Sequence, residues 1–100
     1  MLGLVEQAAV KAVLTDLVAG QRVPASQIDT LLGVSFEQLV KVAEAYPVVE
    51  GIDLEVFDLA IHNGLNLYVN GISVSEAEWE EIGSSQADVE KAFEQWQRTI

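Results

Sequence analysis

The 100 residues are enough for one domain with a modest core and too few for a catalytic domain with a separate substrate domain. Half of them are apolar and 21% are charged, which predicts a folded chain, and the absence of cysteine excludes disulfides, thiolate nucleophiles and thiolate metal sites. The formal net charge of -11 opposes binding to DNA, RNA and anionic lipid, because affinity for polyanions depends on Lys and Arg.

The charge is unevenly distributed along the chain. Eleven acidic residues and no Lys or Arg lie between Lys41 and Lys91. Such a negative field attracts a basic protein, although the acidity could also serve only to keep a small protein soluble. No apolar run approaches the roughly 20 residues that span a bilayer, and Glu6 and Lys11 interrupt the N-terminal apolar pattern. Neither a membrane segment nor an export signal is expected, and the lack of cysteine fits the cytoplasm.

The first predicted element is an amphipathic helix over 2–19, which Gly20 ends. Its apolar residues recur at spacings of three and four, the period of one helix face. They are Leu2, Val5, Ala9, Val13 and Leu17. A short link over 21–23 follows, and Pro24 suits the first turn of a short second helix that ends at Gly33.

A third helix is predicted to begin after Ser35 and to run to about Ala45. Ser35 and Gln38 form a capping-box pattern, in which each side chain satisfies the backbone amide of the other. Tyr46-Pro47 ends this helix, because the residue before a proline avoids the α region.

A β-hairpin is predicted over about 51–74. Two runs rich in branched and aromatic residues flank Asn63-Gly64, and Asn-Gly between such runs is a strong hairpin signal. A helix over 53–62 is the alternative, because part of the first run also fits helical spacing. The residues at that spacing are Leu54, Phe57 and Ile61.

Two helices are predicted in an acidic C-terminal part over 75–100. Ser75 and Ser85 each begin a capping pattern, and Gly83 ends the first of the two helices. The second helix carries an apolar stripe at intervals of four, three and four, which must be buried on the domain or on a partner. The stripe is Val89, Phe93, Trp96 and Ile100.

This order of elements resembles the winged helix-turn-helix domain, somewhat as in the N-terminal domain of biotin-operon repressors. Gly33 stands where the family has its turn glycine, within the stretch 26–43. The apolar positions of that stretch match the family's buried positions at Ile28, Leu32, Val34, Leu39 and Val42. The resemblance implies an α+β fold in one domain, 1–100. Three N-terminal helices, with a helix-turn-helix core over about 10–46, precede the hairpin and the two C-terminal helices.

DNA-binding members of this family carry cationic and amide side chains on the third helix. The corresponding helix and wing tip of this chain combine two acids with a single lysine, which makes a poor reader of DNA. These positions are Phe36, Glu37, Gln38, Lys41 and Glu44 on the helix, and His62 and Asn63 at the tip. The resemblance therefore implies a protein-binding module more than a repressor.

No catalytic, cofactor-binding or metal site is expected, so the chain is not expected to be an enzyme. His62 is the only histidine and is expected to be an exposed loop residue, and zinc would need more nitrogen or sulfur ligands. The acids from Asp53 to Asp58 lack the spacing and the central glycine of a calcium loop. Carboxylate pairs such as Glu76 with Glu80 are interpreted as a solvated helix face.

The leading hypothesis is a noncatalytic protein-binding module that inhibits or antagonises a basic protein, for instance one that itself binds nucleic acid. Phage inhibitors, anti-CRISPR proteins, antirepressors and immunity proteins are of this type, and some of them mimic DNA. The predicted partner-binding residues are Phe36, Glu37, Lys41, Asp58, Asn63, Glu76, Trp79 and Glu80, of which Trp79 is expected to be exposed.

Two alternatives stay open. One is a DNA-binding winged-helix regulator that acts as a homodimer, with Arg22, Gln38 and Lys41 near the duplex. The other is a subunit or assembly factor of a larger complex, for which the C-terminal apolar stripe would be the contact surface.

Overall fold

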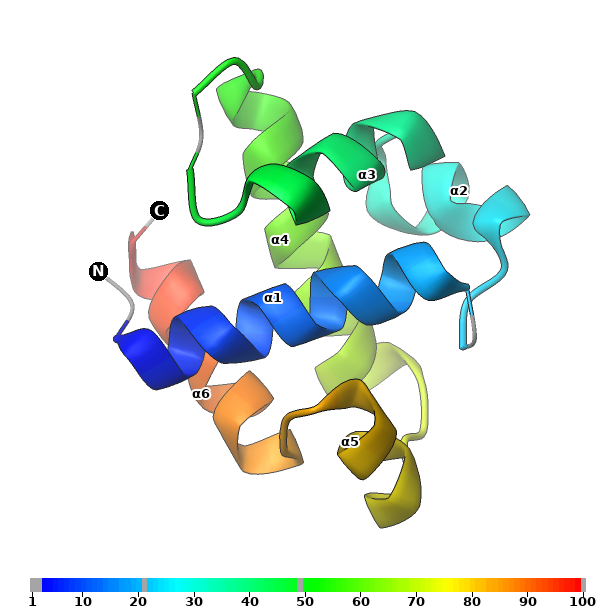
Figure 1. The fold of residues 1–100 in the computed structure, drawn as a ribbon, viewed down its shortest axis with the longest axis vertical. Coiled ribbons are helices and arrows are strands. Elements are labelled where there is room, and N and C mark those ends of the chain that lie inside the picture. The colour runs from blue at the N-terminus through cyan, green and yellow to red at the C-terminus, as the bar shows by residue number, and fades with distance from the viewer. Residues whose placement is uncertain (1–2, 21, 49, 100) are drawn as a thin grey trace.

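Six α-helices and no strand are formed by the described residues of the computed structural model, which are 3–20, 22–48 and 50–99, with the backbone alone for 98 and 99 (Figure 1). The helices are α1 (Leu4–Ala19), α2 (Ile28–Leu32), α3 (Phe36–Ala45), α4 (Leu54–Asn66), α5 (Glu76–Ile82) and α6 (Gln86–Thr99). A 3-10 turn, η1 (Ala25–Gln27), leads into α2, and a π-helical turn, η2 (Leu67–Gly71), follows α4.

Helix α1 crosses the middle of the molecule and touches α3, α4, α5 and α6 (Figure 1). Five of its apolar residues are almost completely buried, since neighbouring helices cover them, whereas Val5 of the predicted stripe is exposed. The five buried residues are Ala9, Val10, Val13, Leu14 and Leu17. The predicted N-terminal helix is thus confirmed and ends at Gly20, whose φ of 73° is the left-handed conformation that glycine favours. Leu2 lies outside the described residues.

The third predicted helix is confirmed as α3, together with its capping box. Ser35 Oγ accepts the backbone N–H of Gln38 at 3.1 Å, and Gln38 Oε1 accepts the backbone N–H of Ser35 at 2.8 Å. Tyr46 leaves the helix with an extended backbone (ψ 134°), as expected for a residue before proline.

The turn between α2 and α3 also forms as expected. Gly33 has a φ of 77°, and the predicted apolar positions around it are buried. The second α-helix is shorter than predicted. Pro24 is followed by the 3-10 turn η1, and the regular α-helix begins only at Ile28. In the predicted link over 21–23, Gln21 lies outside the described residues.

The predicted β-hairpin is wrong, and the alternative helix is correct. Residues 54–66 form α4, which passes without interruption through Asn63 and Gly64. Asp53 caps this helix by accepting the backbone N–H of Glu55 at 2.8 Å. The buried positions recur at spacings of three and four and pack against the core, which a strand of the same sequence would not allow. They are Phe57, Ala60, Ile61, Gly64 and Leu65.

Asn63 and Gly64 serve helix packing here rather than a turn. The Asn63 side chain donates a hydrogen bond to the carbonyl of Leu32 at 2.7 Å, which ties α4 to the end of α2. A Cβ at Gly64 would lie 3.2 Å from Leu17 Cδ1, so glycine allows the close approach of α4 and α1. Without a hairpin among the described residues, the resemblance to a winged helix and the α+β fold class are both overturned.

Both C-terminal helices are confirmed, as α5 and α6. Ser75 and Glu78 form a capping box, and Ser85 Oγ accepts the backbone N–H of Asp88 at 3.2 Å. The apolar stripe of α6 belongs to the core: Val89 and Phe93 are buried and Trp96 packs against them. Ile100 lies outside the described residues.

None of the described helices combines the length and the apolar character needed to cross a bilayer.

Candidate protein-binding surface

Four of the eight predicted partner-binding residues are exposed, and they form two groups on opposite sides of α1. Glu37 and Lys41 are exposed on α3, and Glu76 and Glu80 are exposed on α5. Figure 1 shows α3 and α5 at opposite ends of the molecule, with α1 between them. Helix α1 therefore separates the two groups, which do not form one continuous patch.

The other four predicted residues contribute to packing. Trp79 is only 6% exposed and lies against Tyr68, with ring centroids 6.3 Å apart, so the expectation of an exposed Trp79 is wrong. Asp58 accepts a hydrogen bond from Trp96 Nε1 at 3.1 Å, and Asn63 is bound to α2 as described above. Phe36 is half-buried against the core. A tertiary contact therefore already holds each of these four side chains.

A partly buried ion cluster joins the end of α1 to α5. Arg22, whose side chain is 7% exposed, contacts Asp16 Oδ1 at 2.8 Å, Glu81 Oε2 at 3.0 Å and Glu78 Oε2 at 3.2 Å. The hydroxyl of Tyr68 donates a hydrogen bond to the second oxygen of Asp16. We call these five residues the Arg22 cluster. Since Arg22 is enclosed in it, the predicted role of this arginine near a DNA duplex is not available.

The surroundings of the Arg22 cluster shift the pKa of three of its members. Burial raises the pKa of Tyr68, and the hydrogen bond and charge of Asp16 raise it further. Burial lowers the pKa of Arg22, but the hydrogen bond to Glu81 and the three neighbouring carboxylates outweigh burial and raise it. Hydrogen bonds from the backbone and side chain of Ser75 lower the pKa of Glu78. Three carboxylates thus share one guanidinium, which leaves two negative charges uncompensated.

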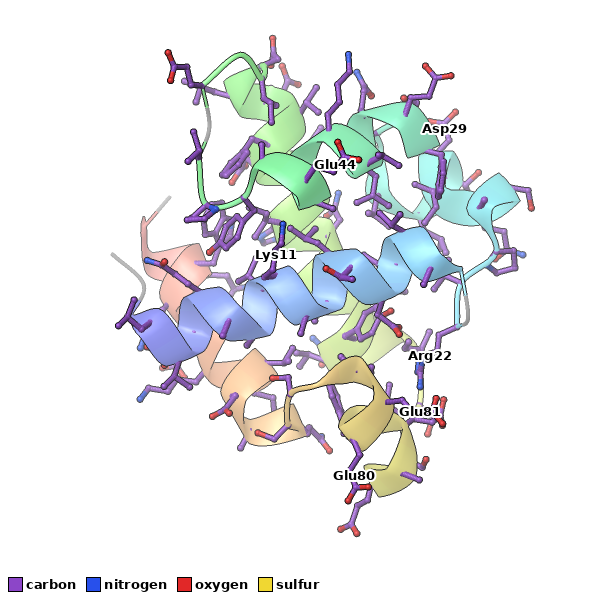
Figure 2. All side chains as sticks on the ribbon, viewed as in Figure 1. Lys11, Arg22, Asp29, Glu44, Glu80 and Glu81 are labelled. Carbon is purple, nitrogen blue, oxygen red and sulfur yellow. The ribbon has the colours of Figure 1, made fainter. Side chains whose placement is uncertain are left out.

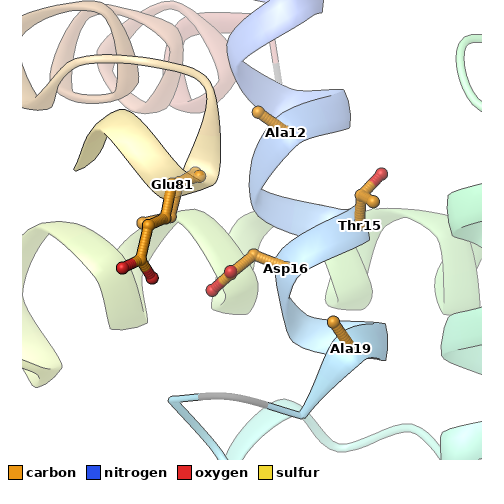
Figure 3. A pocket seen from close by; sticks show the side chains of 6 residues that line it. Ala12, Thr15, Asp16, Ala19 and Glu81 are labelled. Carbon is orange, nitrogen blue, oxygen red and sulfur yellow. The ribbon is translucent and has the colours of Figure 1, made fainter. Parts of the chain in front are cut away.

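A groove of about 540 Å³ lies between α1 and α5, beside the Arg22 cluster. We call it the α1–α5 groove. Figure 3 shows its α1 wall, formed by side chains from successive turns of the helix, with Glu81 of α5 on the opposite side. The lining residues are Ala12, Thr15, Asp16, Ala19, Glu81 and Ile82.

The exposed charge is almost entirely negative. Among the side chains that the structure describes, eleven carboxylates but only two lysines are exposed. The exposed acids are Asp29, Glu37, Glu44, Glu50, Asp53, Glu55, Glu76, Glu80, Glu81, Glu90 and Glu94, and the exposed lysines are Lys41 and Lys91. Lys11 and Arg22 are held in internal contacts, because Lys11 Nζ donates to the carbonyl of Ala43 at the end of α3 and Arg22 is enclosed in its cluster (Figure 2).

Two of the residues considered for metal binding, His62 and Asp53, have structural contacts. The expectation that His62 is an exposed loop residue is wrong. It lies half-buried in α4, with its ring centroid 5.4 Å from that of Phe93. Asp53 caps α4. Within the described ranges, no group of three or more histidine or acidic side chains is placed to hold a metal ion. The expected absence of a metal, a cofactor and catalysis stays a prediction.

The Arg22 cluster is the feature that sequence reasoning missed. Asp16 lies between the buried positions Val13 and Leu17, so a charged residue at the edge of an apolar stripe was the available signal. The sequence offered no means of pairing it with Arg22 and Tyr68, because the contact between Asp16 and Tyr68 spans 52 residues of the chain.

Comparison with known proteins identifies no relative of this chain. No protein-family model, no curated protein and no solved structure matches it significantly. Its function is therefore inferred from its own surface chemistry.

Proposed function

We propose that this protein is a noncatalytic binding module that attaches to a basic protein and acts as an inhibitor or antagonist of that partner. The imbalance of exposed charge is the observation that carries the proposal: eleven exposed carboxylates face two exposed lysines among the described side chains. Two of the five cations are also withdrawn into internal contacts, which makes the surface more acidic than the composition alone implies.

Helix α5 is the part of this surface best suited to a basic partner. Four of its seven residues are glutamate, and Glu76 and Glu80 lie one turn apart on an exposed face. Like charges at this spacing destabilise an isolated helix by a few tenths of a kcal/mol, about 0.2–0.5. Arg22, which is the cation in contact with α5, is itself enclosed by Glu78 and Glu81. A partner's cations would relieve this repulsion.

Exposed ion pairs contribute little individually, typically about 0.2–1 kcal/mol each, so several must act together. Their main effects are faster association and selection of partners of opposite charge, both of which weaken with salt. A protein that binds nucleic acid carries a basic surface of the required sign. By covering such a surface, this chain would exclude the phosphates, which is the physical basis of the proposed antagonism.

The proposal is tested by capturing partners at low salt, purifying the captured basic protein and measuring its Kd by titration at ionic strengths of about 50–300 mM. We expect the Kd to rise steadily with salt and labelled DNA bound to the partner to be displaced. The paired substitution Glu76→Gln and Glu80→Gln is expected to weaken binding about tenfold. Its matched control, Glu44→Gln with Glu50→Gln, removes the same charge from exposed positions outside α5.

Three results would count against this function. The first is that no captured protein binds with salt-sensitive affinity. The second is that the captured partner keeps its bound DNA in the presence of this chain, which would remove the antagonist role. The third is tight, sequence-selective binding of this chain to a DNA duplex at physiological ionic strength, which its charge opposes.

A further inference from the structure

We propose that the α1–α5 groove receives one arginine or lysine side chain of the basic partner and is the anchoring site of the interaction. This inference rests on the proposed function and names the place where the partner binds. The groove combines three features: a volume of about 540 Å³, a wall of small side chains, and an acidic rim with uncompensated charge.

The shape of the groove suits a long, narrow side chain. Ala12, Thr15, Asp16 and Ala19 follow one another at spacings of three, one and three, so they lie on one face of α1 over two turns, or about 10 Å. Alanine at both ends leaves room that a larger side chain would fill. The methyl groups of Ala12 and Ala19, together with Ile82 of α5, offer an apolar surface for the stem of an arginine or lysine.

The charge of the groove selects a cation. Asp16 and Glu81 both line it, and with Glu78 they share the single guanidinium of Arg22. A carboxylate has about four acceptor positions on its two oxygens. Glu81 uses Oε2 for Arg22, while its Oε1 receives no hydrogen bond from the described residues, and the side chain is 62% exposed. A second cation can therefore bind Glu81 without displacing Arg22.

Arg22 also prepares the groove for that cation. Its contacts with Asp16 on the α1 side and Glu81 on α5 hold the two carboxylates beside the groove, so little side-chain entropy is lost when the partner binds. Anions are excluded by the two uncompensated negative charges. The Thr15 hydroxyl, exposed on the same wall, supplies a further acceptor.

The test uses the ¹⁵N-labelled chain and acetylated hexa-arginine as the probe, at low ionic strength. We expect the backbone amide signals of Thr15, Ala19 and Glu81 to shift at lower peptide concentration than those of Glu37 on α3 or Glu90 on α6. Ala19→Leu fills the groove at an exposed position and is expected to raise the Kd about tenfold, whereas Ala87→Leu, the same change on the exposed surface of α6, is expected to leave it unchanged. Glu81→Gln, which keeps the shape, is expected to raise the Kd severalfold.

The possible outcomes separate the two proposals. Binding with the largest shifts on α3 or α6, or unchanged affinity of Ala19→Leu and Glu81→Gln, overturns the groove and leaves the basic partner in place. Complete absence of salt-sensitive binding overturns the proposed function and the groove together. Spermine, a polyamine without peptide bonds, is the second probe: if it shifts the groove signals at the same concentration as hexa-arginine, the assignment to a protein side chain is overturned.

Discussion

Removing the positive charge of Arg22 is expected to destabilise the protein more than any change on its acidic surface. In the variant Arg22→Met the apolar part of the side chain is kept, while Asp16, whose side chain is 8% exposed, loses its cation. A buried charge left without its partner costs about 3–5 kcal/mol. The contacts with Glu78 and Glu81 are 40% and 62% exposed at the carboxylate side and add only about 0.2–1 kcal/mol each.

A loss of this size is a large part of the total free energy of unfolding, which is about 5–15 kcal/mol for a small domain. For a chain of 100 residues, a loss of about 3 kcal/mol lowers the Tm by about 12–24 °C. Urea unfolding followed by tryptophan fluorescence measures the change in free energy directly, since Trp79 lies against Tyr68 of the same cluster.

Two further variants test the reasoning. Glu81→Gln removes an exposed contact of the same arginine and is expected to cost less than about 1 kcal/mol. Adding Asp16→Asn to Arg22→Met removes the unpaired charge while keeping an oxygen for the Tyr68 hydroxyl, and is expected to recover about 1–3 kcal/mol. If Arg22→Met costs no more than Glu81→Gln, the buried pair of Arg22 and Asp16 does not stabilise the fold in the way described.

Three other predictions concern the helix ends and a buried phenol. Ser75→Ala removes the cap of α5 and is expected to lower the free energy of unfolding, measured in urea, by about 1 kcal/mol. The control Ser26→Ala, at an exposed serine outside the capping boxes, should change the stability little, and equal effects of the two variants would contradict the cap. Lys11→Met removes the hydrogen bond to the last turn of α3 and is expected to cost about 1 kcal/mol, and an unchanged unfolding midpoint would contradict that role. Burial raises the pKa of Tyr46 to about 12, so this phenol keeps its proton in the folded chain while the unfolded chain loses it near pH 10. Its contribution to the free energy of unfolding is fully present below pH 10 and falls by about 1.4 kcal/mol per pH unit as the pH rises toward 12. Because the pKa of Tyr68 is raised as well, Tyr46→Phe should reduce the measured slope by that amount without abolishing it, and an unaltered slope would refute the assignment.

The sequence by itself determined the helices whose ends are set by near neighbours. The capping residues Ser35, Ser75 and Ser85 each bind an amide three residues ahead, and Gly20 and Gly83 end their helices in left-handed conformations. Such interactions act within a few residues of the chain, so their signals can be recognised without knowledge of the fold. The net negative charge belongs to the same class, since it depends on composition alone.

Only the tertiary structure decided the segment 54–66 and the candidate site. The run around Asn63-Gly64 satisfies the patterns of both a hairpin and a helix, and the choice depends on the α1 surface, where Gly64 permits close packing. The enclosure of Arg22 depends on Glu81, 59 residues away, and the inward position of Trp79 depends on its packing against Tyr68 of η2. Local pattern cannot reveal such contacts, because the free energy that selects among locally acceptable conformations comes from burial against partners that only the complete fold brings together.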